Sequence, residues 1–264
     1  MVCYKKFLNQ QKLLLVLGLS AIGIILAPSS ASAFTIVNRD NLTDTQFNNL
    51  LHTGEYTETF VAESRMGNNQ TNGDRELGIN NPLLSKGDGT FTPLTIAAEG
   101  QRIWKSGELV DFKLEYDGNS VKYTVGGQLL SSDSTFKGGA ATDIFLRTFA
   151  LANTGGTSKL TDLFLNGEAI GKDLISTATS ANDLDYIQIS GITTPFTLTG
   201  KSSFAWIGHN TATGSRIAYQ IKVVNSKSVP EPGMVTGMLV AGAMGVANAK
   251  RKKQSLTTNL IKHS

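Results

Sequence analysis

The sequence is poor in the side chains that most often carry catalysis or metal binding. Its 264 residues include one cysteine, Cys3, and three histidines. A single cysteine cannot form an intramolecular disulfide, and Cys3 lies ahead of the first apolar run, so the body of the chain has no disulfide framework and no cysteine nucleophile. The body must therefore be held together by apolar burial, for which roughly 200 residues can supply a sizeable core.

The body of the chain also lacks a surplus of positive charge. The whole sequence has a formal net charge of +3. Between residues 34 and 229, however, 16 basic residues stand against 20 acidic ones, a net charge of −4. The excess of basic residues lies in the terminal segments, so binding of nucleic acid through a general basic surface is disfavoured. Anionic partners are disfavoured too, unless a cation bridges them.

The first 33 residues have the three parts of a secretory signal peptide. Three lysines accompany a fifteen-residue apolar run at residues 13–27, and Ala31, Ser32 and Ala33 form a small-residue cleavage site. A retained membrane anchor is the alternative, but the run is shorter than the ~20 residues that span a bilayer. We expect signal peptidase to cleave after Ala33, so that the mature protein begins at Phe34.

A second composite segment covers residues 229–253. It opens with Val229, Pro230, Glu231 and Pro232, continues with seventeen mostly small or apolar residues, and closes with Lys250, Arg251, Lys252 and Lys253. The prolines stop a regular helix from running back into the body, the apolar stretch can enter a bilayer, and the basic cluster prefers the cytoplasmic face. A helix of this length spans about 25 Å, less than the hydrocarbon core. Residues 254–264 form a short polar tail.

The order of Pro-Glu-Pro, apolar helix and basic cluster resembles the PEP-CTERM sorting signal of Gram-negative bacteria. The resemblance covers about 25 residues and coincides with a signal peptide at the opposite end. It implies processing by exosortase, a membrane-embedded cysteine peptidase, after transient anchoring in the inner membrane. The mature species is then expected to lack the residues after about Glu231. An ordinary tail anchor is the alternative.

One short helix is marked near the start of the body. Thr43 and Gln46 form a capping-box pair, and Leu42 and Phe47 stand where a hydrophobic staple requires them. Gly54 can end the helix. We expect two to three turns.

The rest of the body follows the period-two pattern of strands. Val110, Phe112, Leu114 and Tyr116 alternate with charged residues, and the alternation resumes after Gly118. Eleven strands are expected, at residues 57–63, 90–97, 101–105, 110–116, 121–125, 143–151, 160–165, 186–189, 196–199, 203–207 and 215–224. Residues 34–228 are therefore predicted to form an all-β domain, an antiparallel β-sandwich or jelly roll with one short N-terminal helix, flanked by the signal peptide and the C-terminal transmembrane sorting helix.

This plan resembles the choice-of-anchor domains of bacterial surface proteins. The resemblance rests on an exported β-rich domain joined to a sorting tail, and on residues 60–77. It implies a location at the surface rather than a chemistry.

A polar cluster at residues 68–76 is a candidate calcium site. Asn72, Asp74 and Glu76 offer side-chain oxygens at alternate positions, and Gly73 allows a tight loop. The full spacing of a calcium loop is missing. The alternative is a structural loop in which Arg75 pairs with Glu63 or Glu76. No other cofactor is expected.

Two tryptophans, Trp104 and Trp206, are candidates for stacking against sugar rings. Both have apolar neighbours in strand-like runs, so the alternative is packing in the core.

No motif for catalysis is convincing. Gly200-Lys201-Ser202 resembles the end of a phosphate-binding loop but has strand patterns on both sides. His52 and His209 fit surface positions. Carboxylates share a strand face at Asp111 and Glu115 and again at Asp183 and Asp185, as any solvated sheet face allows.

These observations favour a non-enzymatic protein of the cell surface or extracellular matrix with a structural or adhesive role. Signal peptidase and exosortase are its expected processing partners. A carbohydrate-binding module for exopolysaccharide is the alternative, followed by a polysaccharide-active enzyme on the same fold.

Overall fold

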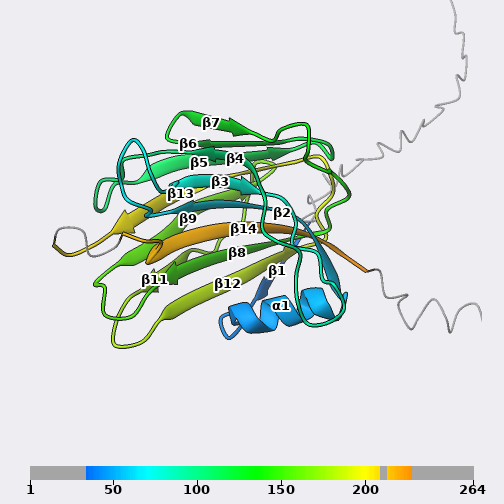
Figure 1. Cartoon of the computed structure of the whole chain (residues 1–264), viewed down its shortest axis with the longest axis horizontal. Coiled ribbons are helices and arrows are strands. Elements are labelled where there is room, and N and C mark those ends of the chain that lie inside the picture. Colours follow the sequence, from blue (N-terminus) through cyan, green and yellow to red (C-terminus); the bar gives the residue numbers. More distant parts are fainter. Residues whose placement is uncertain (1–33, 209–212, 228–264) are drawn as a thin grey trace, which may run out of the picture. The chain divides into compact units, whose positions relative to one another are not determined.

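The chain folds into two antiparallel β-sheets packed face to face, with one short helix (Figure 1). The structure is a computed structural model, and it describes residues 34–208 and 213–227. The prediction of an all-β sandwich with one N-terminal helix is confirmed. In the described part of the chain, no helix is both long and apolar enough to cross a membrane.

The first sheet has the strand order β1-β12-β8-β14-β2-β3-β4. Its strands are β1 (Thr35–Asn38), β12 (Asp183–Ser190), β8 (Asp143–Ala150), β14 (Ile217–Ser226), β2 (Tyr56–Arg65), β3 (Leu77–Asn80) and β4 (Ile96–Gly100).

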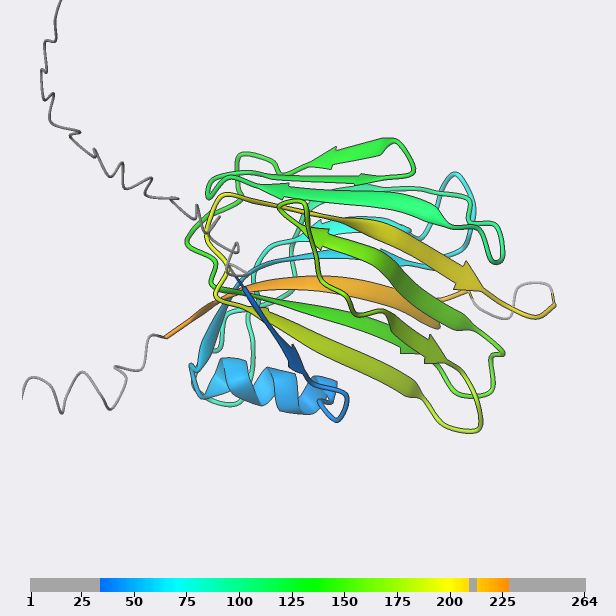
Figure 2. The ribbon, with the colours of Figure 1, turned by 180° about the vertical axis from the view of Figure 1, so that it is seen from behind.

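The second sheet has the order β10-β9-β13-β5-β6-β7, and β11 also pairs with β9. Its strands are β10 (Glu168–Ala169), β9 (Thr157–Leu165), β13 (Phe196–Ala205), β5 (Val110–Tyr116), β6 (Val121–Val125), β7 (Gln128–Ser131) and β11 (Leu174–Thr177). After β7 the chain passes repeatedly between the two sheets, which Figure 2 shows from behind.

The core lies between the sheets, as the period-two pattern requires. Leu114 of β5 pairs with Tyr123 of β6, and both are fully buried. The predicted hairpin is therefore confirmed. The hydroxyl groups buried in this core bond to one another: Ser64 Oγ lies 2.8 Å from Tyr123 Oη, which donates to Tyr219 Oη at 2.7 Å. Pairing of this kind offsets the cost of burying polar atoms.

Helix α1 (Asp44–His52) covers part of the outer face of the first sheet. Its capping box is formed as predicted, because Thr43 Oγ1 accepts from the Gln46 N–H and Gln46 Oε1 accepts from the Thr43 N–H. Gly54 follows the helix with a φ of 69°. Phe47 is buried against Phe145, with ring centroids 5.2 Å apart. The first sheet is thus covered on both faces where the helix lies.

Some expected strands were wrong. Residues 101–105 form no strand, because Asn69 on a distant loop replaces a neighbouring strand: the Trp104 N–H donates to Asn69 Oδ1 at 2.6 Å, and Asn69 Nδ2 donates to the Trp104 carbonyl at 3.1 Å. Most of residues 90–97 form a loop before β4. The segments 196–199 and 203–207 are largely one strand, β13, which ends at Ala205. The short strands β1, β3, β7, β10 and β11 were not predicted.

Candidate functional site

A cavity of about 900 Å³ opens at the end of the sandwich where β2 begins and β14 ends. Its walls come from the start of β2, the segment 81–95, the loop 132–142 and the end of β14. The lining residues are Thr57, Glu58, Thr59, Asn81, Pro82, Leu84, Thr92, Pro93, Thr95, Ile96, Thr135, Lys137, Gly138, Gly139, Ala140 and Asn225. Only Glu58 and Lys137 in this wall carry charge.

Glu58 is a buried carboxyl in the wall of this cavity, with an exposed fraction of 3%. Its Oε2 accepts a hydrogen bond from the Leu83 N–H at 2.7 Å, whereas its Oε1 has no hydrogen-bond partner among the described residues. Burial raises the pKa of Glu58, against the opposing effects of the nearby Lys222 charge and the Leu83 N–H. The site therefore contains a carboxyl with unused hydrogen-bonding capacity.

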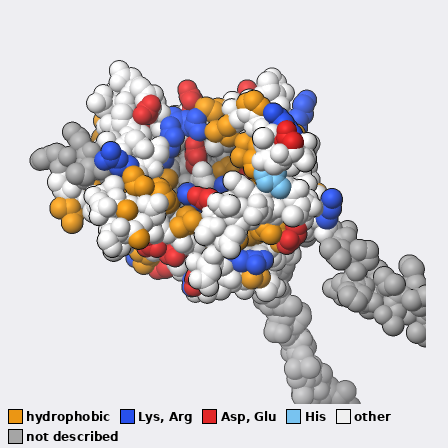
Figure 3. All heavy atoms as spheres, turned by 60° about the horizontal axis from the view of Figure 1, so that its bottom comes forward, with side chains coloured by type: hydrophobic (Ala, Val, Ile, Leu, Met, Phe, Trp, Pro, Cys, Tyr) orange, Lys and Arg blue, Asp and Glu red, His pale blue; other side chains and the backbone are white. Residues whose placement is uncertain are grey.

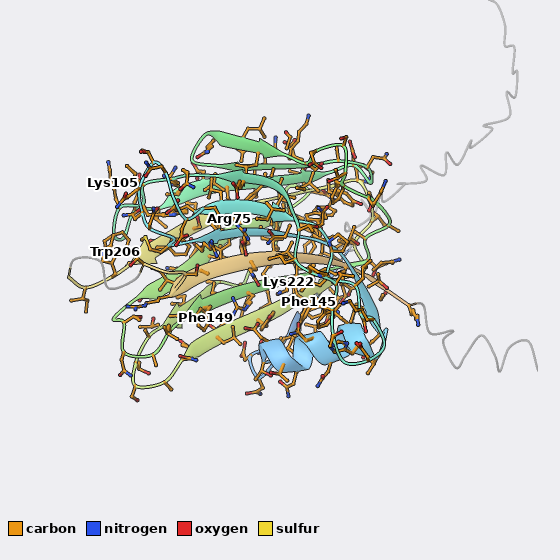
Figure 4. The ribbon with its side chains drawn as sticks, viewed as in Figure 1. Arg75, Lys105, Phe145, Phe149, Trp206 and Lys222 are labelled. Atoms are coloured by element: carbon orange, nitrogen blue, oxygen red, sulfur yellow. The ribbon has the colours of Figure 1, made fainter. Side chains whose placement is uncertain are left out.

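Lys222 lies on the same outer face of the first sheet. Its Nζ is 4.7 Å from the centroid of the Phe47 ring, a cation–π contact beneath helix α1. Burial lowers the pKa of Lys222, while the charge of Glu58 opposes that shift. Figure 4 shows Lys222 and Phe145 beside the helix. Burial thus shifts both ionisable groups toward their neutral forms.

Ion pairs continue along this face. Arg147 of β8 donates to both carboxylate oxygens of Asp44 at the start of α1, at 2.7 and 2.6 Å. Burial raises the pKa of Asp44, but the hydrogen bonds and charge of Arg147 outweigh it, so the pKa is lowered. This bidentate pair fixes the helix to the sheet.

A second buried pair joins β2 to the segment before β3. Arg75 donates to Glu63 Oε1 at 2.6 Å, and Gln220 donates to Glu63 Oε2 at 3.1 Å. Arg75 also donates to Asn80 Oδ1. The predicted alternative, in which Arg75 pairs with Glu63, is confirmed. Figure 3, which brings this side forward, shows basic and acidic side chains gathered in and around a hollow.

A smaller cavity of about 590 Å³ lies on the outer face of the second sheet. Lys201 Nζ lies 3.8 Å from both Asp111 and Asp162, and Phe164 is 39% exposed. Asp162 has a φ of 50°, beside a register shift between β9 and β13. Bulges of this type redirect side chains, here bringing a carboxylate toward Lys201.

The carboxylates considered for a catalytic dyad have other partners. Lys201 lies near Asp111, and Glu115 pairs with Lys113 at 2.8 Å. On the other pair, Asp183 accepts from the Thr177 N–H at 2.7 Å and Asp185 from the Ile175 N–H at 3.2 Å. Asp183 and Asp185 therefore bond the edge of β11 and tie the two sheets together.

The two tryptophans do not form one platform for sugars. Trp104 is 2% exposed, donates from Nε1 to the Arg65 carbonyl at 3.2 Å and packs on Phe204. It belongs to the core, because its ring faces the space between the sheets. Trp206 is partly buried against the same core, and its N–H donates to Ser106 Oγ.

The three residues of the calcium hypothesis differ in their burial. Glu76 is fully buried and accepts from the Asn69 N–H at 2.7 Å, while Asn72 and Asp74 are exposed. In residues 34–208 and 213–227, no three His, Cys, Asp or Glu residues are grouped so as to hold a metal ion. The buried Glu76 carboxyl thus holds the backbone of this loop through its hydrogen bond to Asn69. Calcium binding by Asn72, Asp74 and Glu76 stays a prediction.

Two further predictions concern single positions. His52 lies at the end of α1, stacked on Phe91 with ring centroids 4.0 Å apart and with Nδ1 2.9 Å from Ser85 Oγ. Gly200, Lys201 and Ser202 lie within β13, so they have strand on both sides rather than strand then helix.

Several predictions lie outside the described residues. They are the cleavage-site residues Ala31 and Ala33, the sorting motif from Val229 to Pro232, the basic cluster from Lys250 to Lys253, and His209. They stay predictions.

Sequence reasoning missed Glu58 and Lys222. Each occupies a polar position in an alternating strand, which normally indicates a solvated face. One signal was present: β8 contains Ile144, Phe145 and Leu146 in succession, which places apolar side chains on both of its faces and indicates a strand covered on both sides. No protein-family model and no curated protein matches this chain, so no residue receives a role from a relative.

Proposed function

We propose that the chain is an exported protein of the cell surface or extracellular matrix with a structural or adhesive, non-enzymatic role. Export uses the general secretory route, and the C-terminal segment holds the precursor transiently in the inner membrane until exosortase processes it. In this proposal the β-sandwich body is of the jelly-roll type, and it is flanked by a signal peptide and a transmembrane sorting helix.

The observation that carries the adhesive role is the exposed apolar surface at one end of the sandwich. Ile103, Leu109 and Ile207 are 54%, 58% and 78% exposed. Ser106 binds the backbone of Trp206, which joins the two loops that carry these side chains. We name Ile103, Leu109 and Ile207 the tip. Exposed apolar side chains on neighbouring loops can supply a surface that binds another molecule.

The tip lies opposite the end from which the sorting segment leaves. β13 ends at Ala205 and β14 begins at Ile217, so Trp206, Ile207 and the residues just before Ile217 lie near the start of β14, about 30 Å from its last residue, Ser226. Figure 4 shows Trp206 and Lys105 at this end, away from the exit of β14. A body tethered through its C-terminal side would present the tip outward.

The sheet is also suited to carry load from the tether. β14 pairs with β2 from Ala218 to Ser226 and with β8 from Ile217 to Val224. Hydrogen bonds between antiparallel strands lie perpendicular to the strands, so tension along β14 loads many bonds at once.

Binding of the purified mature protein to cells that lack it tests the adhesive role. The triple variant Ile103→Ser, Leu109→Ser, Ile207→Ser should lose most cell-bound protein in flow cytometry. The matched control is Leu129→Ser on β7, where the side chain is also 58% exposed. Wild-type binding by the triple variant, or an equal loss in the control, would contradict the role of the tip.

A further inference from the structure

We propose that the 900 Å³ cavity is a binding site for a neutral saccharide and that Glu58 is its polar anchor. This inference deepens the adhesive role. It rests on the proposed export of the protein, because a glycan partner is encountered outside the cell. It assigns sugar binding to the wall around Glu58 rather than to the tryptophans.

The composition of the cavity wall matches a polyhydroxylated ligand. Five threonines and two asparagines supply groups that both donate and accept hydrogen bonds, and Pro82, Leu84, Pro93 and Ile96 supply apolar surface for the C–H faces of a sugar ring. Small-molecule sites of about 300–1,000 Å³ commonly combine apolar walls with a few polar groups that fix orientation.

Some of this capacity is free for a ligand. The partly buried Asn225 side chain makes no hydrogen bond within the described residues, although it lines the cavity. Others are used internally, since Thr92 Oγ1 accepts from the Leu84 N–H and Asn81 Nδ2 donates to Thr95 Oγ1. Thr59 Oγ1 also donates to the Ala140 carbonyl and Thr135 Oγ1 to Asp133 Oδ1, so these bonds hold the cavity wall in shape.

Glu58 is the second, independent observation. A carboxyl that is 3% exposed has one oxygen bonded to Leu83 and the other without a partner among the described residues. A buried acceptor of this kind is costly unless something donates to it. Because Glu58 stands in the cavity wall, a rotation of its carboxyl group toward the cavity lets a ligand hydroxyl donate to Oε1.

The charges around the cavity select against ionic ligands. Its two charged lining residues, Glu58 and Lys137, have opposite signs. Burial disfavours the charged form of Glu58, which weakens any attraction of this carboxyl for a cation. An anion would find Lys137 as the one basic residue among those that line the cavity. A neutral ligand rich in hydroxyl groups meets none of these penalties.

Calorimetric and NMR titration of the mature secreted protein tests the proposal. The neutral probes are cellotetraose, maltotetraose and mannotetraose, and the charged probes are tetragalacturonate and a chitosan tetramer. We expect a neutral probe to bind, and Glu58→Gln to weaken that binding by about tenfold or more, since the amide cannot match the carboxyl as an acceptor. Asn225→Ala should weaken it as well.

The matched control is Thr199→Ala, which alters the cavity on the outer face of the second sheet and should leave binding unchanged. If Glu58→Gln shows no melting transition and therefore does not fold, Asn225→Ala is the variant that tests the proposal, and it should bind the neutral probe more weakly than the wild type. Binding of no neutral probe, stronger binding of a charged probe, or loss of binding in Thr199→Ala alone would overturn the proposal. Because surface location is measured separately by mass analysis, failure here leaves the export proposal intact.

Discussion

The effect of a charged side chain on the stability of this sandwich depends on whether the face that carries it is covered. Arg75 and Glu63 are 12% and 9% exposed and form a 2.6 Å pair, whereas Lys113 and Glu115 form a 2.8 Å pair at 46% and 40% exposure. Water screens the second pair but barely reaches the first.

Replacing Arg75 by methionine should therefore destabilise the protein by about 3 kcal/mol at pH 7, because Glu63 is left buried without its partner. Burial alone would raise the pKa of Glu63, but the hydrogen bond and charge of Arg75 outweigh it and hold the pKa below its usual value. In the wild type, this contribution is present above the unfolded pKa of about 4.3 and is lost as the pH falls through the lower folded pKa.

In the Arg75→Met variant the folded pKa of Glu63 should rise instead, so the cost of the substitution should shrink as the pH falls toward 4. Urea denaturation at pH 4 and pH 7 measures both effects. Lys113→Met is the control and should cost about 0.5 kcal/mol or less at either pH. Equal losses in the free energy of unfolding for the two substitutions at pH 7 would show that burial does not make the Arg75–Glu63 pair more important to stability.

For single residues, the sequence predicts the partner of a charged side chain better than it predicts whether that side chain is buried. The pairing of Arg75 with Glu63 was one of two alternatives drawn from their proximity along the chain, and it is the one formed. The burial of Glu58 and Lys222 was not predictable from their own strands. It depends on α1 and the segment 81–95, which cover a face that the alternation marks as solvated.

Helix α1 is the element whose ends are most completely set by local sequence. Thr43→Ala removes the acceptor for the Gln46 N–H, 3.2 Å away, and one half of the capping box. We expect a loss of about 1 kcal/mol in the free energy of unfolding, measured by urea denaturation.

Thr43→Ser is the matched control and should retain most of the stability, since serine offers the same oxygen. If serine and alanine are equally destabilising, the capping bond is not the cause, and the loss of the threonine methyl group is.

The elements that sequence reasoning missed depend on distant partners. β11 is four residues long, and its outer N–H groups are bonded by Asp183 and Asp185 of β12. The strand expected at residues 101–105 is instead a loop bonded to Asn69. Local alternation cannot distinguish these cases, because only the tertiary fold determines which strand edge lies beside a segment.

At the scale of the whole molecule, the two ends of the sandwich have different surfaces. One end carries the tip, and the other carries the cavity beside Glu58 and the last residue of β14. The sandwich itself followed from alternation and turn residues. The cavity did not, because it needs the 81–95 segment, the loop 132–142 and the two ends of paired strands to meet.

The central claim is that this sandwich is exported and processed at both ends. Intact-mass analysis of the protein recovered from the surface or matrix of cells expressing the full chain tests it most directly. The account predicts one mature species that begins at Phe34 and ends near Glu231. A surface species that retains residues 1–33, or that carries Lys250 to Ser264, would contradict it.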